Sequence, residues 1–300
     1  MPLTASQAVA LILVTLIWGV NWTVMKVGVG EMPPLMFRAA CLWVAVPVLV
    51  LFMQWRGIPY HVPKGERFKV LRLAAVNLVL WNMLIILAMP LLSSGRAAIL
   101  GYTMPVFAAI AGAVLYKAGM QGRHFVGMAA AITGSVLLLW HEMAALAGRP
   151  TGVFLALSAA LFWGVGTQML RHTRLSMHTV TFTLWSVLLG ATVLTVCALL
   201  FELPEFRWPG TPGLLAVLYN GLLVLSVAQV GWFLLARELP PQASTLGVML
   251  IPVIGVFSGV LLLGEPLHWQ DVVAVVLMLL AMFSVLWPSR ANSSKNEAAR

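Results

Sequence analysis

The chain has 300 residues, of which 61% are hydrophobic and only 9% are charged. Soluble globular domains carry about 25% charged residues, so this composition excludes a water-soluble protein and predicts an integral membrane protein. The net charge of +9 does not indicate nucleic-acid binding, because the basic residues lie between apolar segments. In that position they suit cytoplasmic loops that face anionic lipid. Cys41 and Cys197 lie inside apolar segments and are expected to pack as small hydrophobic residues.

Ten segments are long and apolar enough to cross a membrane, since a hydrocarbon core of about 30 Å takes about 20 helical residues. The predicted spans are 7–26, 35–54, 70–90, 95–116, 125–141, 152–170, 179–201, 212–236, 241–263 and 270–287. Residues 1–6 contain no Lys or Arg, so we expect the first segment to be a span and not a cleaved signal peptide. Residues 288–300 are polar, and we expect them to form a disordered cytoplasmic tail.

The Lys and Arg residues predict the orientation of these spans. If the N-terminus is cytoplasmic, 13 of the 18 Lys and Arg residues fall on the inner side of the membrane. Cytoplasmic loops carry an excess of Lys and Arg. We therefore expect both termini to be cytoplasmic.

One stretch of sequence occurs twice. Residues 104–124 recur as residues 251–271, at a distance of 147 positions and without a gap, and Pro105 corresponds to Pro252. A repeat at a fixed distance indicates an internal duplication. The copies, 1–145 and 146–287, contain five predicted spans each, so the second must cross the membrane in the opposite orientation. The sequence therefore predicts an all-α integral membrane protein with ten transmembrane helices in two inverted five-helix repeats, an architecture typical of alternating-access transporters.

Further paired motifs point to a family. Trp18-Gly19 corresponds to Trp163-Gly164, the prolines at 105 and 252 form a pair, and Gly264-Glu265-Pro266-Leu267 follows the ninth span. In these motifs the chain resembles the drug/metabolite transporter superfamily, specifically its ten-span EamA-type exporters, over residues 7–287. The first copy departs from the family pattern, with Lys117-Ala118-Gly119 in place of Gly-Glu-Pro. The closest resemblance is to the aromatic amino acid exporters of bacterial inner membranes. It implies a multi-pass inner-membrane protein with spans 2 and 7 beside a central cavity and spans 5 and 10 behind it.

The ionisable residues argue against several mechanisms. All nine acidic residues and all six histidines lie in loops or at span ends. A proton relay usually needs an ionisable residue at depth, so a pump driven through a buried glutamate is disfavoured. The chain also lacks the His-Glu-x-x-His and Gly-x-Ser-x-Gly motifs. We expect no enzyme activity, no metal site and no cofactor, and we favour transport down a gradient.

Several aromatic and amide side chains lie near the middle of the predicted spans, away from the interfaces where tryptophan usually sits. Packing between helices is one explanation for them, and the lining of a substrate cavity is the other. As a set they favour the cavity. The predicted substrate-binding residues are Trp18, Asn21, Trp22, Asn77, Trp81, Tyr102, Trp163 and Gln229. Pro105 and Pro252 are predicted to kink their helices as a symmetric pair of gates.

Three basic residues and one acidic residue near span ends have simpler explanations than substrate binding. We expect Lys26, Arg38 and Arg96 to reach lipid headgroups, with a positive outer vestibule as the alternative. Glu265 is expected to cap a turn or a helix start. No basic residue is expected at mid-depth, which argues against phosphorylated substrates.

These features predict a secondary transporter that exports amino acids, with aromatic or apolar ones favoured, and related small metabolites. The alternatives are a multidrug or organic-cation exporter and a ligand-binding membrane receptor that does not transport. The expected partners are the lipid bilayer and neutral amino acids, with no nucleic acid. We expect a monomer or a weak homodimer.

Overall fold

A computed structural model describes residues 5–118, 122–144, 150–231 and 241–286, and it contains helices and no strands over these ranges. The α-helices are α1 (Ala5–Glu31), α2 (Pro34–Trp55), α3 (Arg67–Ala74), α4 (Leu80–Ala88), α5 (Ser94–Gly101), α6 (Met104–Tyr116), α7 (Gly122–Ala144), α8 (Pro150–His172), α9 (Thr179–Phe201), α10 (Thr211–Leu218), α12 (Pro241–Leu263) and α13 (Trp269–Leu286). Shorter 3-10 and π segments are η1 (Lys64–Glu66), η2 (Ala75–Val79), η3 (Met89–Leu91), η4 (Leu203–Glu205) and η5 (Tyr219–Ala228). Each of the ten predicted spans has a helix or a run of helices in its described part. The predicted tail, 288–300, and part of the eighth span lie outside the described residues.

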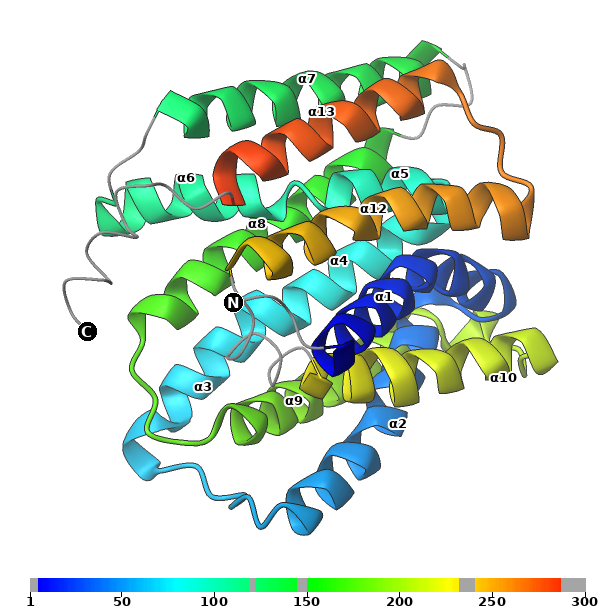
Figure 1. Cartoon of the computed structure of the whole chain (residues 1–300). Coiled ribbons are helices and arrows are strands. Elements are labelled where there is room, and N and C mark those ends of the chain that lie inside the picture. Colours follow the sequence, from blue (N-terminus) through cyan, green and yellow to red (C-terminus); the bar gives the residue numbers. More distant parts are fainter. Residues whose placement is uncertain (1–4, 119–121, 145–149, 232–240, 287–300) are drawn as a thin grey trace.

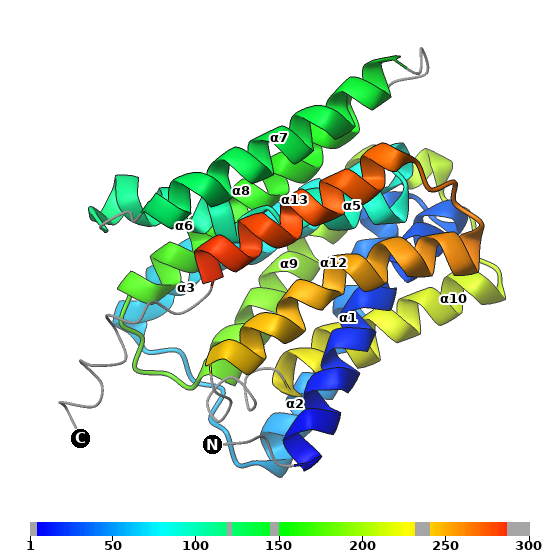
Figure 2. The same cartoon turned by 45° about the horizontal axis from the view of Figure 1, so that its top comes forward.

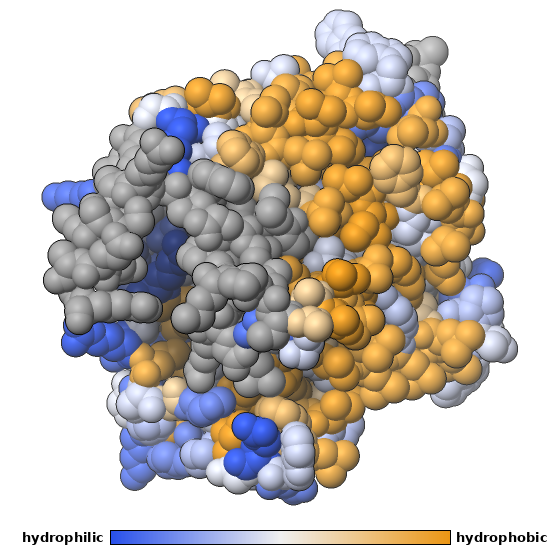
Figure 3. All heavy atoms as spheres, viewed as in Figure 1, coloured by the Kyte–Doolittle hydropathy of each residue, from blue (hydrophilic) through white to orange (hydrophobic). Residues whose placement is uncertain are grey.

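The surface of the helices is apolar, as a membrane requires. Seven helical stretches are long and apolar enough to cross a bilayer, and Met249–Leu263 and Trp269–Ser284 are shorter apolar helices, counted over the described residues. A broad hydrophobic surface crosses the molecule between more hydrophilic edges (Figure 3). Because lipid offers no hydrogen bonds to the backbone, helices that satisfy their own N–H and C=O groups are the expected solution.

The helices form one bundle in which elements of the two predicted halves pack against each other. α7 and α13 lie side by side at one edge, and α2 and α9 pack together at the opposite edge (Figures 1 and 2). Between them, α1 packs on α12, and α8 packs on α4 and α6. The expected places of spans 2, 5, 7 and 10 around a central cavity stay a prediction.

The Trp-Gly motifs of the two copies make equivalent contacts. A Cβ atom on Gly19 would lie 2.6 Å from the Cβ of Ile254 in α12, and one on Gly164 would lie 2.9 Å from the Cβ of Phe107 in α6. Position 107 is the counterpart of position 254 at the 147-residue distance. In both copies the glycine therefore lets the first helix approach the proline-containing helix of the other copy closely.

The proline-containing helices also end in the same way. Lys117 after α6 and Gly264 after α12 both have a left-handed backbone, with φ of 54° and 65°. The next amide donates to the carbonyl of Gly112 in the first copy, at 3.1 Å, and of Gly259 in the second, at 3.2 Å. Both proline-containing helices therefore end with a left-handed residue, followed by a backbone hydrogen bond to the carbonyl six positions earlier.

The two prolines themselves differ, which corrects the prediction of equivalent kinks. Pro252 lies inside α12, which is continuous, whereas Pro105 is the second residue of α6. α6 follows a break in the fourth span at Tyr102 and Thr103. Proline is well tolerated in the first turn of a helix, where its missing N–H has no partner to lose. Pro105 therefore starts a new helix.

Candidate functional site

Four of the predicted aromatic residues converge where the fourth span is broken. The Trp81 ring in α4 lies 5.2 Å from the Trp163 ring in α8, and the Trp22 ring in α1 lies 6.1 Å from the Tyr102 ring at the end of α5. Gly101 joins the two pairs, because a Cβ atom there would lie 2.7 Å from Trp22 and 3.4 Å from Trp81. We call Trp22, Trp81, Tyr102 and Trp163 the aromatic cluster. Both copies contribute to it.

The predicted amides lie around this cluster in different ways. Asn77, in the π segment η2, donates from Nδ2 to the carbonyl of Trp163 at 3.3 Å. Asn21, which precedes Trp22 in the chain, is buried, and its Oδ1 has no hydrogen-bond partner. Gln229 is half-buried at the end of η5.

Trp18 was predicted to share a helix face with Trp22, but it also has other neighbours. It packs partly against a small group around Val14 and Ala228, next to Gln229 in the chain. Trp18 also packs partly against the buried group that contains Trp22 and Tyr102, so it lies beside the aromatic cluster as well.

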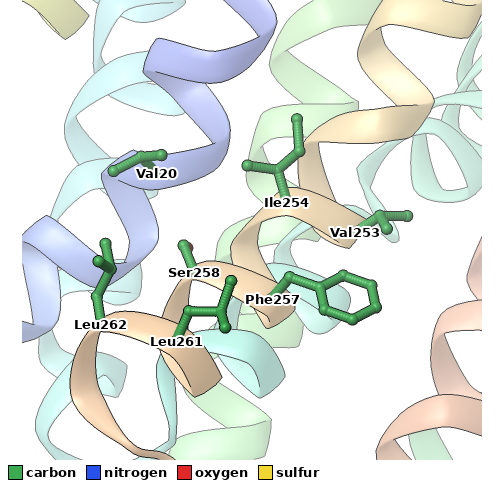
Figure 4. A pocket seen from close by; sticks show the side chains of 7 residues that line it. All are labelled: Val20, Val253, Ile254, Phe257, Ser258, Leu261 and Leu262. Atoms are coloured by element: carbon green, nitrogen blue, oxygen red, sulfur yellow. The ribbon is translucent and has the colours of Figure 1, made fainter.

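An apolar groove of about 320 Å³ lies between α1 and α12. Val20 comes from α1 and six side chains come from α12 (Figure 4). Its one polar side chain, Ser258, is hydrogen-bonded to Thr23 at 2.6 Å. Phe257 and Leu261 are exposed, so the groove opens to the surroundings of the bundle and offers nothing to the charges of an amino acid.

Several carboxylates lie near the point where α1 ends and α2 begins, which we call the Glu31 end. There the Glu265 carboxylate accepts hydrogen bonds from the Ser94 amide at 2.8 Å and from the Ser94 hydroxyl at 2.7 Å. Ser94 is the first residue of α5. This confirms that Glu265 caps a helix start, and it shows that the capped helix belongs to the other copy.

A second contact between the copies lies beside the first. Arg96 of α5 is buried, and its Nε donates to the carboxylate of Asp271 in α13 at 2.8 Å. The second carboxylate oxygen of Asp271 accepts from the His268 amide at 2.9 Å. We call the contacts of Glu265 with Ser94 and of Asp271 with Arg96 the α5 lock.

Arg38 and Arg96, two of the three cations expected at lipid headgroups, are buried, so that prediction is wrong for them, and Lys26 is half-buried. Lys26 donates to the carbonyls of Met89 and Leu92, at 2.8 and 2.6 Å. Arg38, like Arg96, is buried. Other helices supply partners at this depth that the sequence did not predict.

Two more carboxylates tie the copies together at the Glu31 end. Glu202, after α9, accepts from the first amides of α2, those of Leu35 and Met36, at 3.0 and 2.9 Å. Glu31 accepts from the amide of Gly210 at 3.0 Å. Anions are stabilising at helix N-termini, so these contacts join the two predicted halves at the Glu31 end.

Sequence reasoning missed two features of the site. Asn220, a polar residue within the eighth predicted span, was not considered, although its position was a usable signal. The π segments η2 and η5 lie in the third span of each copy, and no residue pattern predicts them. Such segments frequently occur at functional sites. Among the described residues, no group of three His, Cys, Asp or Glu side chains could hold a metal ion.

The chain also matches a known protein family. A model of the EamA-like transporter family matches residues 6–140 and 150–287. The chain belongs to the EamA-like transporter family. The match covers almost the whole chain, and the protein is therefore a membrane transporter of this family.

Its relatives are similar over almost their whole length. The chain is 27% identical to the "Uncharacterized transporter YoaV" of Bacillus subtilis, covering 91% of this chain and 94% of that one. It is 24% identical to a "Probable amino-acid metabolite efflux pump" of Escherichia coli, covering 94% and 95%. It is 25% identical to the "Uncharacterized inner membrane transporter YedA" of the same species, covering 94% and 92%. One solved crystal structure has the same fold, with a TM-score of 0.67 at 19% identity and coverage of 95% and 97%.

Proposed function

We propose that this transporter exports neutral amino acids, with aromatic or apolar side chains favoured, across the bacterial inner membrane. The aromatic cluster is the observation that carries the proposal. It lies between elements of both copies, and its rings offer faces and edges to an apolar or aromatic side chain. Each aromatic pair contributes about 0.5–1.5 kcal/mol beyond burial. A relative named as an amino-acid metabolite efflux pump supports the same substrate class.

The mechanism we propose is alternating access by two inverted five-helix repeats, with the substrate held between them. The equivalent contacts of Gly19 and Gly164 and the equivalent ends of α6 and α12 support two copies of one unit. The Glu31 end is then the periplasmic gate, closed here by the contacts of Lys26, Glu202 and the α5 lock.

The difference between the two copies supports the direction of export. At the 147-residue distance, the counterparts of Glu265 and Asp271 are Ala118 and His124, and the counterpart of Arg96 is Ala243. A lock of the same kind therefore cannot form at the cytoplasmic end. The state closed to the periplasm and open to the cytoplasm is favoured at rest, and it receives substrate from the cytoplasm.

Efflux from loaded cells tests this function. Cells that express the transporter are loaded with labelled phenylalanine, and we expect them to lose the label faster than cells with an empty vector. Cells expressing Trp81→Ala at the same level should resemble the vector control. Equal efflux from all three would contradict amino acid export. Faster loss of a quaternary organic cation alone would favour the organic-cation exporter, since the same rings attract cations.

A further inference from the structure

A buried arginine without an acidic partner lies between α1, α2 and η5. Arg38 is 3% exposed. Its Nη1 donates to Oδ1 of Asn220 at 3.3 Å, its Nη2 contacts the sulfur of Met25, and its Nε has no partner. Within the part of the chain that the structure describes, no carboxylate pairs with it. The nearby Glu202 carboxylate is engaged by the first amides of α2.

A second unsatisfied group lies one helical turn away. Asn21 is 8% exposed, and its Oδ1 is buried without a partner. Asn21 precedes Met25 by four residues, so the two side chains lie on the same face of α1. Arg38 contacts Met25, so its guanidinium lies about one turn along α1 from the unpaired amide oxygen of Asn21.

Such a pair of groups is expensive to maintain inside a membrane protein. A buried charge without a partner is strongly unfavourable, and an ionisable residue within a span usually serves function. Arg38 and Asn21 offer opposite chemistry, because a guanidinium donates to anions and an amide oxygen accepts from cations. A guanidinium fits a carboxylate with two parallel hydrogen bonds.

We propose that Arg38 binds the carboxylate of the amino acid substrate and that the Asn21 amide oxygen accepts from its ammonium group. This inference rests on the proposed function and gives its substrate a recognition site. Asn21 and Trp22 are consecutive, so α1 connects this site to the aromatic cluster that receives the side chain. The groups are packed in this conformation, and binding requires α1 and α2 to separate at this level.

The test is equilibrium binding of four ligands to the purified transporter: phenylalanine, two analogues that each lack one of its charged groups, and a phosphorylated sugar. These are L-phenylalanine, phenethylamine without the carboxylate, 3-phenylpropionate without the ammonium, and a hexose phosphate. Wild-type protein should bind phenylalanine about tenfold or more tightly than either analogue, because a hydrogen bond to a charged group is worth that much. Arg38→Gln should weaken phenylalanine by about tenfold or more and leave phenethylamine unchanged.

The reciprocal variant and two controls sharpen this test. Asn21→Ala should weaken phenylalanine and leave 3-phenylpropionate unchanged. Arg56→Gln removes an exposed cation that lies over Trp55, and it should bind all four ligands as the wild type does. Arg38 has no carboxylate partner, so Arg38→Gln should unfold at about the wild-type temperature, which separates lost binding from lost structure.

Each other outcome overturns the proposal. If Arg38→Gln keeps the wild-type preference for phenylalanine over phenethylamine, Arg38 does not bind the carboxylate, while amino acid export stands. If wild-type protein binds hexose phosphate and Arg38→Gln does not, the arginine serves a phosphate. If wild-type protein binds no amino acid, the proposed function and this site both fail.

Discussion

Replacing Asp271 with asparagine is expected to open the Glu31 end of the transporter. Asp271 is 5% exposed and accepts from Arg96 at 2.8 Å. Asparagine has the same size and can still accept from the His268 amide, but it has no charge to offer Arg96. Removing one partner of a buried ion pair costs about 3–5 kcal/mol. This cost falls on the closed state, so the population should shift towards the state open at this end.

Cysteine labelling measures this shift. Ala98 in α5 is fully buried against α12. A Cβ atom on Gly255 of α12 would lie only 2.9 Å from the Cβ of Ala98. A single cysteine is placed at position 98 in a protein that lacks Cys41 and Cys197, and a membrane-impermeant thiol reagent is added outside the cell. This cysteine should react about tenfold or more faster in Asp271→Asn than with Asp271 present, because each 1.4 kcal/mol is a factor of ten.

Two controls distinguish gate opening from general loosening. A cysteine at Gly30, which is exposed with open space around it, should react equally in both backgrounds. Adding Arg96→Gln to Asp271→Asn removes the cation that has lost its carboxylate, and labelling at position 98 should slow again. Equal labelling at position 98 with and without Asp271 would show that the α5 lock does not hold the gate.

Replacing Trp81 with alanine is expected to reduce phenylalanine transport by about tenfold or more, because the ring contributes its burial and at least one aromatic pair. Trp81 lies against Trp163 and faces Gly101, so its loss removes the centre of the aromatic cluster. Trp81→Phe keeps a ring and should retain more activity. The measurement is the initial rate of exchange in proteoliposomes, normalised to the amount of folded protein.

Trp43 provides the matched control. It lies in α2 and is 45% exposed on the outside of the bundle. Trp43→Ala removes an equally large ring but leaves the aromatic cluster intact, so it should transport at close to the wild-type rate. A similar loss in both variants would mean that Trp81 matters for packing and not for the substrate.

The helices were predictable because lipid imposes a simple length rule. The segment predicted at residues 179–201 is α9 (Thr179–Phe201), and prolines lie in the first turns of α2 and α10. Apolar length and turn residues are local properties, so they are visible in a single sequence.

The contacts between the copies were not predictable, because they join residues far apart in the chain. Ser94 and Glu265 are 171 positions apart, and Arg96 and Asp271 are 175 apart. The sequence placed these residues correctly at span ends, where lipid headgroups are the usual partners of a cation. Only the packing of α5 against α12 and α13 supplies a carboxylate instead.

The candidate site was predictable in part. Mid-depth position identified Trp22, Trp81, Tyr102 and Trp163, which meet in one cluster. Helix periodicity places Trp18 and Trp22 on one face, but it does not show that Trp18 also packs against Val14 and Ala228. Arg38 was misjudged for a related reason, since burial depends on how α1 and η5 cover α2.

Counterflow in proteoliposomes tests the central claim most directly. Vesicles that contain the purified transporter and a high concentration of unlabelled phenylalanine are diluted into labelled phenylalanine. A carrier that exposes one site alternately to each side should accumulate label transiently above its equilibrium level, and protein-free vesicles should not. Saturable binding of phenylalanine without any such overshoot would contradict amino acid transport by alternating access.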